Sequence, residues 1–111
     1  MELTTTGRRT GRDRIVILGY LEDGDSLVTM AMNGWQEGHP AWWLNLEAHP
    51  DAVVRLSGQE PRRVRAHAAT GEERDRLWRR WAAVDKQLDD FAALRSVETP
   101  VVVLEPVIAG G

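Results

Sequence analysis

The chain has 111 residues, 42% of them apolar and 28% charged, and a net charge of −3 at pH 7. This length predicts one domain over residues 1–111 with a modest core, and the acidic balance argues against a nucleic-acid partner. Zero cysteines exclude disulfides and thiolate sites, and no apolar run reaches the ~20 residues that cross a bilayer, so we expect a cytoplasmic protein without integral membrane contact.

The first third of the chain predicts strands. A β-branched run ends at Gly7, and the continuous apolar run over residues 15–18 is typical of a strand covered on both faces. Asp23-Gly24 between two apolar runs is a hairpin signal. We therefore expect strands over residues 3–6, 14–21 and 26–32.

The rest of the chain predicts two helical regions and three more strands. Pro40 fits the first position of a short helix that ends before Pro50. Thr70 and Glu73 have the spacing of a capping box, and apolar residues recur at helical spacing after them. The expected elements are helix 40–49, strands 52–56 and 62–68, a longer helical region from 71 to about 92, and strand 101–104. About six strands with this arrangement predict a mainly β fold, a small closed or half-closed barrel.

The turn after the first strand is strongly basic. Residues 7–14 contain four arginines and one aspartate, a local charge of +3 in a protein whose net charge is negative. Guanidinium groups bind phosphate oxygens through paired hydrogen bonds, and glycines let turn N–H groups approach the same oxygens. The turn therefore predicts an anion clamp, with a merely solvated charged turn as the alternative.

The short helix carries an adjacent tryptophan pair, Trp42 and Trp43. Neighbouring residues on a helix point about 100° apart, so we expect one ring to pack inward while the other helps form a pocket wall or a subunit contact. Asn45 lies about one turn after Trp42, where its amide could meet donor and acceptor groups on the edge of a heterocycle.

The sequence offers no obvious nucleophile, general base or metal site. Its three histidines, His39, His49 and His67, lie in different predicted elements without carboxylates at ligand spacing. An anion clamp with aromatic walls and no catalytic side chain is typical of chemistry carried by a bound cofactor.

Four motifs in order resemble one family. They occupy residues 3–11, 39–50, 71–78 and 100–106. Together they resemble the deazaflavin (coenzyme F420)-dependent nitroreductase and quinone reductase family, whose cofactor is used mainly by actinobacteria and archaea. The resemblance implies a split β-barrel related to FMN-binding barrels, usually a homodimer. It also implies hydride transfer from reduced F420 to an electron-poor small molecule such as a quinone, an enone or a nitro compound.

The resemblance also implies site residues, although it names no catalytic side chain and no metal. Arg8, Arg9, Thr10 and Arg14 would hold the phosphate and acidic tail of the cofactor, and Met32 with Asn33 would lie near its ring. The full cofactor set is Arg8, Arg9, Thr10, Gly11, Arg14, Met32, Asn33, Gly34, Ala41, Trp42 and Asn45. The acceptor would contact Trp35, Leu88 and Phe91.

The chain departs from the family at two places. Many relatives carry Ser-Lys where this chain has Met32-Asn33, and nitro-reducing members have tyrosines where this chain has Asp85, Leu88 and Phe91. The acceptor pocket should therefore differ, and nitroimidazole reduction is not assumed. The alternatives are a non-catalytic F420 carrier and an FMN-dependent oxidoreductase on the same barrel.

Overall fold

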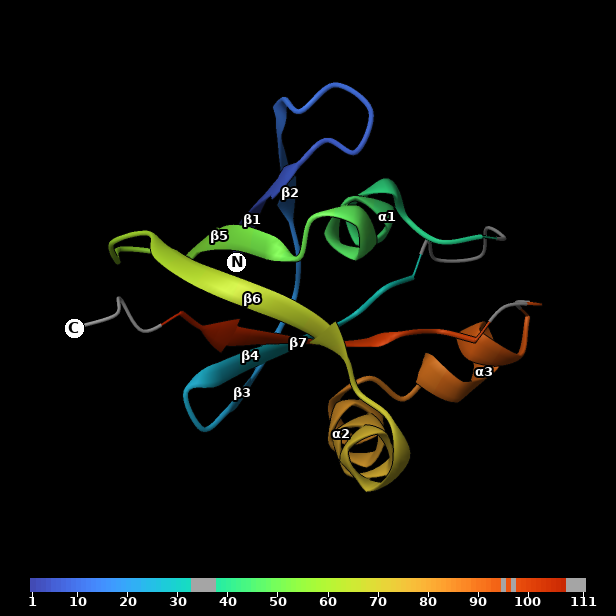
Figure 1. The fold of residues 1–111 in the computed structure, drawn as a ribbon. Coiled ribbons are helices and arrows are strands. Elements are labelled where there is room, and N and C mark those ends of the chain that lie inside the picture. Colours follow the sequence, from blue (N-terminus) through green and yellow to red (C-terminus); the bar gives the residue numbers. More distant parts are fainter. Residues whose placement is uncertain (33–37, 95, 97, 108–111) are drawn as a thin grey trace.

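The computed structural model describes residues 1–32, 38–94, 96 and 98–107. Within them lies one antiparallel sheet of seven strands in the order β2-β1-β5-β6-β7-β4-β3, with three helices (Figure 1). The elements are β1 (Glu2–Thr6), β2 (Asp13–Ile17), β3 (Leu21–Asp23), β4 (Ser26–Met30), α1 (Ala41–Ala48), β5 (Asp51–Arg55), β6 (Arg62–Ala68), α2 (Gly71–Val84), α3 (Leu88–Ala93) and β7 (Val101–Pro106). The predicted mainly β fold is confirmed.

The expected single strand over residues 14–21 was wrong, because it is two strands at opposite edges of the sheet. β2 pairs with β1, whereas β3 pairs with β4. Residues 18–20 join these edges, and three residues reach only about 10 Å, so the sheet must curl until its edges approach each other. The Thr29 hydroxyl fixes this link by donating a 2.9 Å hydrogen bond to the Gly19 carbonyl oxygen.

The expectation that residues 15–18 are covered on both faces was also wrong. Ile15 is 65% exposed and Ile17 is 72% exposed, whereas Val16 packs against the core. Ile15 and Ile17 point to the opposite face of β2 from Val16, and their exposure shows that this face is largely open. β7 lies inside the sheet between β6 and β4, and all four of its residues from Val101 to Leu104 are buried.

Alternation along β7 divides the core into two clusters, because successive side chains of a strand point to opposite faces. Val102 and Leu104 pack with the tryptophans of α1, and Val101 and Val103 pack with residues of α2 and α3. Figure 1 shows α1 beside the β1–β2 hairpin and α2 with α3 on the other side of the sheet. The two helical regions therefore cover different parts of the barrel. No helix in the described residues is long and apolar enough to cross a membrane.

The predicted capping box at the start of α2 is not formed. Thr70 is the N-cap residue, but its side chain makes no capping hydrogen bond. Glu73 instead contacts His67 on β6, with Oε1 3.0 Å from Nε2. The longer helical region is interrupted between α2 and α3.

Asp23 ties the β3–β4 hairpin to α2. Its carboxylate accepts hydrogen bonds of 2.9 and 3.0 Å from Arg76 and one of 3.0 Å from Arg80. The hydrogen bonds from Arg76, followed by the positive charges of both arginines, hold the pKa of Asp23 below its ordinary value. A depressed carboxyl pKa adds stability above the unfolded-state pKa, and this stability is lost as the pH falls through the folded-state pKa.

We expect Asp23→Asn to lower the urea midpoint at neutral pH. The difference from the wild type should shrink below pH ~4, where the unfolded-state carboxyl becomes protonated, and vanish once the folded one does. Urea unfolding across this pH range measures the effect. Asp25→Asn, in the exposed turn of the same hairpin, is the control. A difference between Asp23→Asn and the wild type that stays constant at every pH would contradict the role of the Asp23 charge.

Candidate functional site

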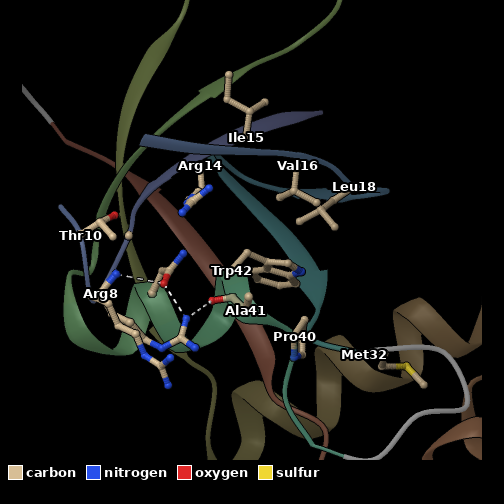
Figure 2. Close-up of a pocket in the computed structure, with 13 residues that line it drawn as sticks. Arg8, Thr10, Arg14, Ile15, Val16, Leu18, Met32, Pro40, Ala41 and Trp42 are labelled. Atoms are coloured by element: carbon tan, nitrogen blue, oxygen red, sulfur yellow. Dashed lines mark hydrogen bonds between the residues drawn. The ribbon is translucent and has the colours of Figure 1, made fainter. Parts of the chain in front are cut away.

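A cavity of about 710 Å³ lies between the turn after β1, strand β2 and the start of α1 (Figure 2). This volume falls in the ordinary range for sites that bind small molecules and cofactors. It is lined by Gly7, Arg8, Arg9, Thr10, Arg14, Ile15, Val16, Leu18, Met32, Pro40, Ala41, Trp42 and Asn45. The structure therefore brings together eight of the eleven predicted cofactor residues, all except Gly11, Asn33 and Gly34.

One end of the cavity is positively charged. Arg8, Arg9 and Arg14 line it, and the lining set contains no aspartate or glutamate. Among the residues that the structure describes, no carboxylate pairs with the guanidinium groups of Arg9 and Arg14. This end can accept an anionic ligand without first breaking an ion pair, because its positive charges are not neutralised by the protein.

The basic turn is closed by hydrogen bonds within its own backbone. The Gly7 N–H donates to the Arg12 carbonyl oxygen at 2.7 Å, and the Gly11 N–H donates to the Gly7 carbonyl oxygen at 2.8 Å. Gly11 has a φ of +72°, a left-handed conformation that suits glycine, and it is not a lining residue. The structure thus shows Gly11 shaping the turn, and its contact with the cofactor stays a prediction.

Gly7 is required by the close packing of this turn. A Cβ atom added there would lie 3.0 Å from the Arg12 carbonyl oxygen and 3.1 Å from Thr10 Oγ1. We expect Gly7→Ala to lower the free energy of unfolding by about 1–3 kcal/mol and to weaken ligand binding, because the backbone must shift. Chemical denaturation measures the loss. Gly19→Ala is the control, since its Cβ meets nothing within 4 Å, and equal losses in both variants would contradict the account.

The other end of the cavity is apolar. Figure 2 shows the Trp42 ring beneath Val16 and Leu18, with Met32 beyond Pro40. Trp42 is 8% exposed and Trp43 is 6% exposed, and both belong to the core cluster, but Trp42 also lines the cavity whereas Trp43 does not. As predicted, one ring of the pair packs inward and the other contributes to a pocket wall, although the wall ring also packs in the core.

Asn45 lies at the cavity, but its amide is already engaged by the protein. Its Oδ1 accepts hydrogen bonds from the Arg8 backbone N–H at 3.1 Å and from Arg8 Nη1 at 2.9 Å. Its Nδ2 donates to Thr5 Oγ1 at 3.2 Å. Both lone pairs of the oxygen are thus used within the protein, and a contact of this amide with a heterocycle stays a prediction.

The predicted acceptor residues do not join this cavity. Leu88 is fully buried in the core cluster of α2, β4 and β7, so it packs α3 onto the sheet and offers no surface to an acceptor. Phe91 is half-buried on α3 and is not a lining residue. Asn33, Gly34 and Trp35 lie outside the described residues.

Sequence reasoning missed five lining residues, Gly7, Ile15, Val16, Leu18 and Pro40. Val16 and Leu18 have the two-residue spacing of a strand face, which could have pointed to the same side as Trp42 once β2 was placed beside α1. No group of three metal-ligating side chains occurs among the described residues.

Comparison with known proteins identifies the family of the chain. Residues 1–106 match the family model described as F420H(2)-dependent quinone reductase. The chain belongs to this family. An F420H(2)-dependent quinone reductase of Mycobacterium tuberculosis is 31% identical over 107 residues, which cover 92% of this chain and 70% of that protein.

Two solved structures extend the similarity to the fold. An F420-H2 dependent reductase superposes with a TM-score of 0.82 at 27% identity, over 94% of this chain and 91% of that one. A second structure, described as a domain-swapped dimer, has a TM-score of 0.83 at 27% identity, over 94% and 78% of the two chains. These matches confirm the predicted family and split-barrel fold.

As a member of the F420H(2)-dependent quinone reductases, the chain is an oxidoreductase and its cofactor is coenzyme F420. Neither the FMN alternative nor the non-catalytic carrier is favoured by the family. The chemistry of the donor set fits this cofactor, because unpaired arginines lie at one end of the cavity and an aromatic, apolar wall lies at the other. Such a cavity suits an acidic tail joined to a planar ring.

Proposed function

We propose that the cavity holds F420 with its acidic tail at Arg8, Arg9 and Arg14 and its ring beside Trp42, where the chain passes a hydride to a quinone. The observation that carries this proposal is the division of one cavity into a carboxylate-free arginine end and an apolar tryptophan end. Met32 and Ala41 line the same space. Asn33 and Gly34, as further cofactor contacts, and Trp35, as an acceptor contact, also remain proposals.

The side chains of this site bind and orient rather than react. When bound, reduced F420 supplies the hydride. Arg9 and Arg14 bind the negative charge of the cofactor. Trp42, together with Val16 and Leu18, keeps water from one side of the cavity. None of the lining residues carries a side chain that ordinarily titrates near neutral pH. We therefore propose that solvent supplies the proton that the reduced quinone needs.

A binding titration followed by a turnover assay tests the function. F420 should bind the purified protein and FMN should bind much more weakly. Reduced F420 should then be oxidised when a quinone is added, and an enone and a nitro compound test the wider acceptor range. Binding of F420 without turnover on any quinone would contradict the reductase, and tighter binding of FMN would contradict the cofactor.

We also propose that the chain forms a homodimer. Support comes from the exposed apolar side chains of Ile15 and Ile17 on the edge strand β2, and from the similar structure described as a domain-swapped dimer. Unpaired edge strands with apolar side chains are natural sites of association. Sedimentation should give a dimer mass that Ile17→Lys reduces to a monomer, whereas a monomeric wild type would contradict the proposal.

A further inference from the structure

A single buried amide joins three segments around the positive end of the cavity. Asn45 on α1 is 3% exposed, and it bonds Thr5 near the end of β1 and Arg8 in the basic turn. These partners lie 40 and 37 residues away in the chain. Figure 2 shows the dashed bonds that run from Arg8 into α1. The amide therefore fixes the turn relative to the helix that carries Trp42.

The chemistry of the partners permits only one orientation of this amide. Both Arg8 groups that reach it are N–H donors, so they require Oδ1. The Thr5 hydroxyl can accept, so it takes Nδ2, and Thr5 is only 1% exposed. A flipped amide would direct its own N–H groups at those of Arg8, leaving buried donors without acceptors.

The groups that hold the Arg8 side chain are neutral, so they do not cancel its positive charge. Arg8 Nη1 also lies 3.5 Å from the Ala41 carbonyl oxygen, so a neutral amide and a neutral carbonyl hold one corner of the guanidinium. No carboxylate pairs with Arg8 among residues 1–32, 38–94, 96 and 98–107. Arg8 is thus ordered while its positive charge stays available, and Nε and Nη2 remain for a ligand.

We infer that Asn45 is a positioning residue, which acts on the anionic part of the cofactor through Arg8 rather than by reading the ring. The inference rests on the proposed cofactor site. A preordered arginine loses less side-chain freedom when the ligand binds, so the tie between Asn45 and Arg8 increases affinity. A carboxylate at position 45 would hold Arg8 equally well but would neutralise it.

A double-mutant cycle with F420 tests this role by calorimetry. Arg8→Ala and Asn45→Ala should each weaken F420 binding by about tenfold, and the double variant should lose clearly less than the product of the two single losses, since residues that act as one unit are not additive. A small further loss beyond Arg8→Ala is expected, because the Arg8 backbone N–H bond to Asn45 remains in that variant. Arg12→Ala in the same turn is the control and should bind normally. Additive losses in the double variant would overturn the inference.

The variant Asn45→Asp tests the position of Arg8 separately from its positive charge. Amide hydrogen exchange in the cofactor-free protein should show the Arg8 backbone N–H protected in the wild type and in Asn45→Asp but exposed in Asn45→Ala. F420 affinity should nevertheless fall in Asn45→Asp. Retained affinity in Asn45→Asp, or unchanged Arg8 exchange in Asn45→Ala, would overturn the inference.

The two readouts distinguish this inference from the proposed function. A wild type that does not bind F420 contradicts the cofactor site, whereas the exchange of the Arg8 N–H decides the tie to Asn45 without any ligand. Asn45→Asp matches the native side chain in size, so it keeps the test decisive if Asn45→Ala does not fold.

Discussion

Replacing Arg9 and Arg14 together by alanine is expected to weaken F420 binding by about two to four decades while the protein stays folded. Each charge-assisted contact contributes about 1.5–3 kcal/mol, and about 1.4 kcal/mol corresponds to one decade. Both side chains line the cavity, and the structure gives neither an acidic partner among the described residues, so stability should change little. Calorimetric titration measures the loss.

The matched control removes two positive charges elsewhere. Arg12 and Arg63 are exposed and do not line the cavity. Arg12→Ala with Arg63→Ala should therefore keep nearly the wild-type affinity, apart from a small long-range effect that added salt screens. Equal losses in the two double variants would mean that only net charge matters, and the arginine clamp would be wrong.

Trp42→Ala is expected to have the second large effect, on stability and on binding at once. Truncating a buried tryptophan costs about 3–5 kcal/mol of unfolding free energy, because it leaves a cavity in the core. Losing the flat wall beside a planar ring should cost a further ~1–3 kcal/mol of binding, judged from aromatic stacking on nucleobases. Urea unfolding and titration at low temperature measure the two effects separately.

Trp43→Ala distinguishes the wall from the core. Trp43 is buried to a similar extent as Trp42 but does not line the cavity, so its truncation should cost similar stability. F420 affinity of the folded Trp43→Ala protein should stay within a few-fold of the wild type. If both variants lost affinity equally, Trp42 would have only a packing role.

The part of the site that sequence could predict depends on local chemistry. The arginines between residues 8 and 14 follow a strand and its glycine, and Trp42 lies two residues after Pro40, the N-cap residue of α1. These local signals fix a hairpin turn and a helix start. The structure brings them together because α1 packs against β1, the strand that leads into the turn.

The rest depends on contacts between distant segments. The role of Asn45 follows from its hydrogen bonds to residues 5 and 8. The role of Leu88 follows from its packing in the core around β7. The exposure of Ile15 follows from the absence of a layer over its face of β2, which depends on where the other elements pack. An apolar run has the same composition at an edge as at the centre, so its pattern alone cannot distinguish the two.

The most direct test of the central claim follows tryptophan indole N–H signals by NMR while F420 is added. Trp42 lines the cavity, whereas Trp78 and Trp81 lie on α2 across the sheet. We predict large shifts for the Trp42 indole and for the backbone amides of Arg9 and Thr10, with Trp78 and Trp81 nearly unchanged. Shifts at Trp78 and Trp81 without any at Trp42 would place the cofactor elsewhere and contradict the account.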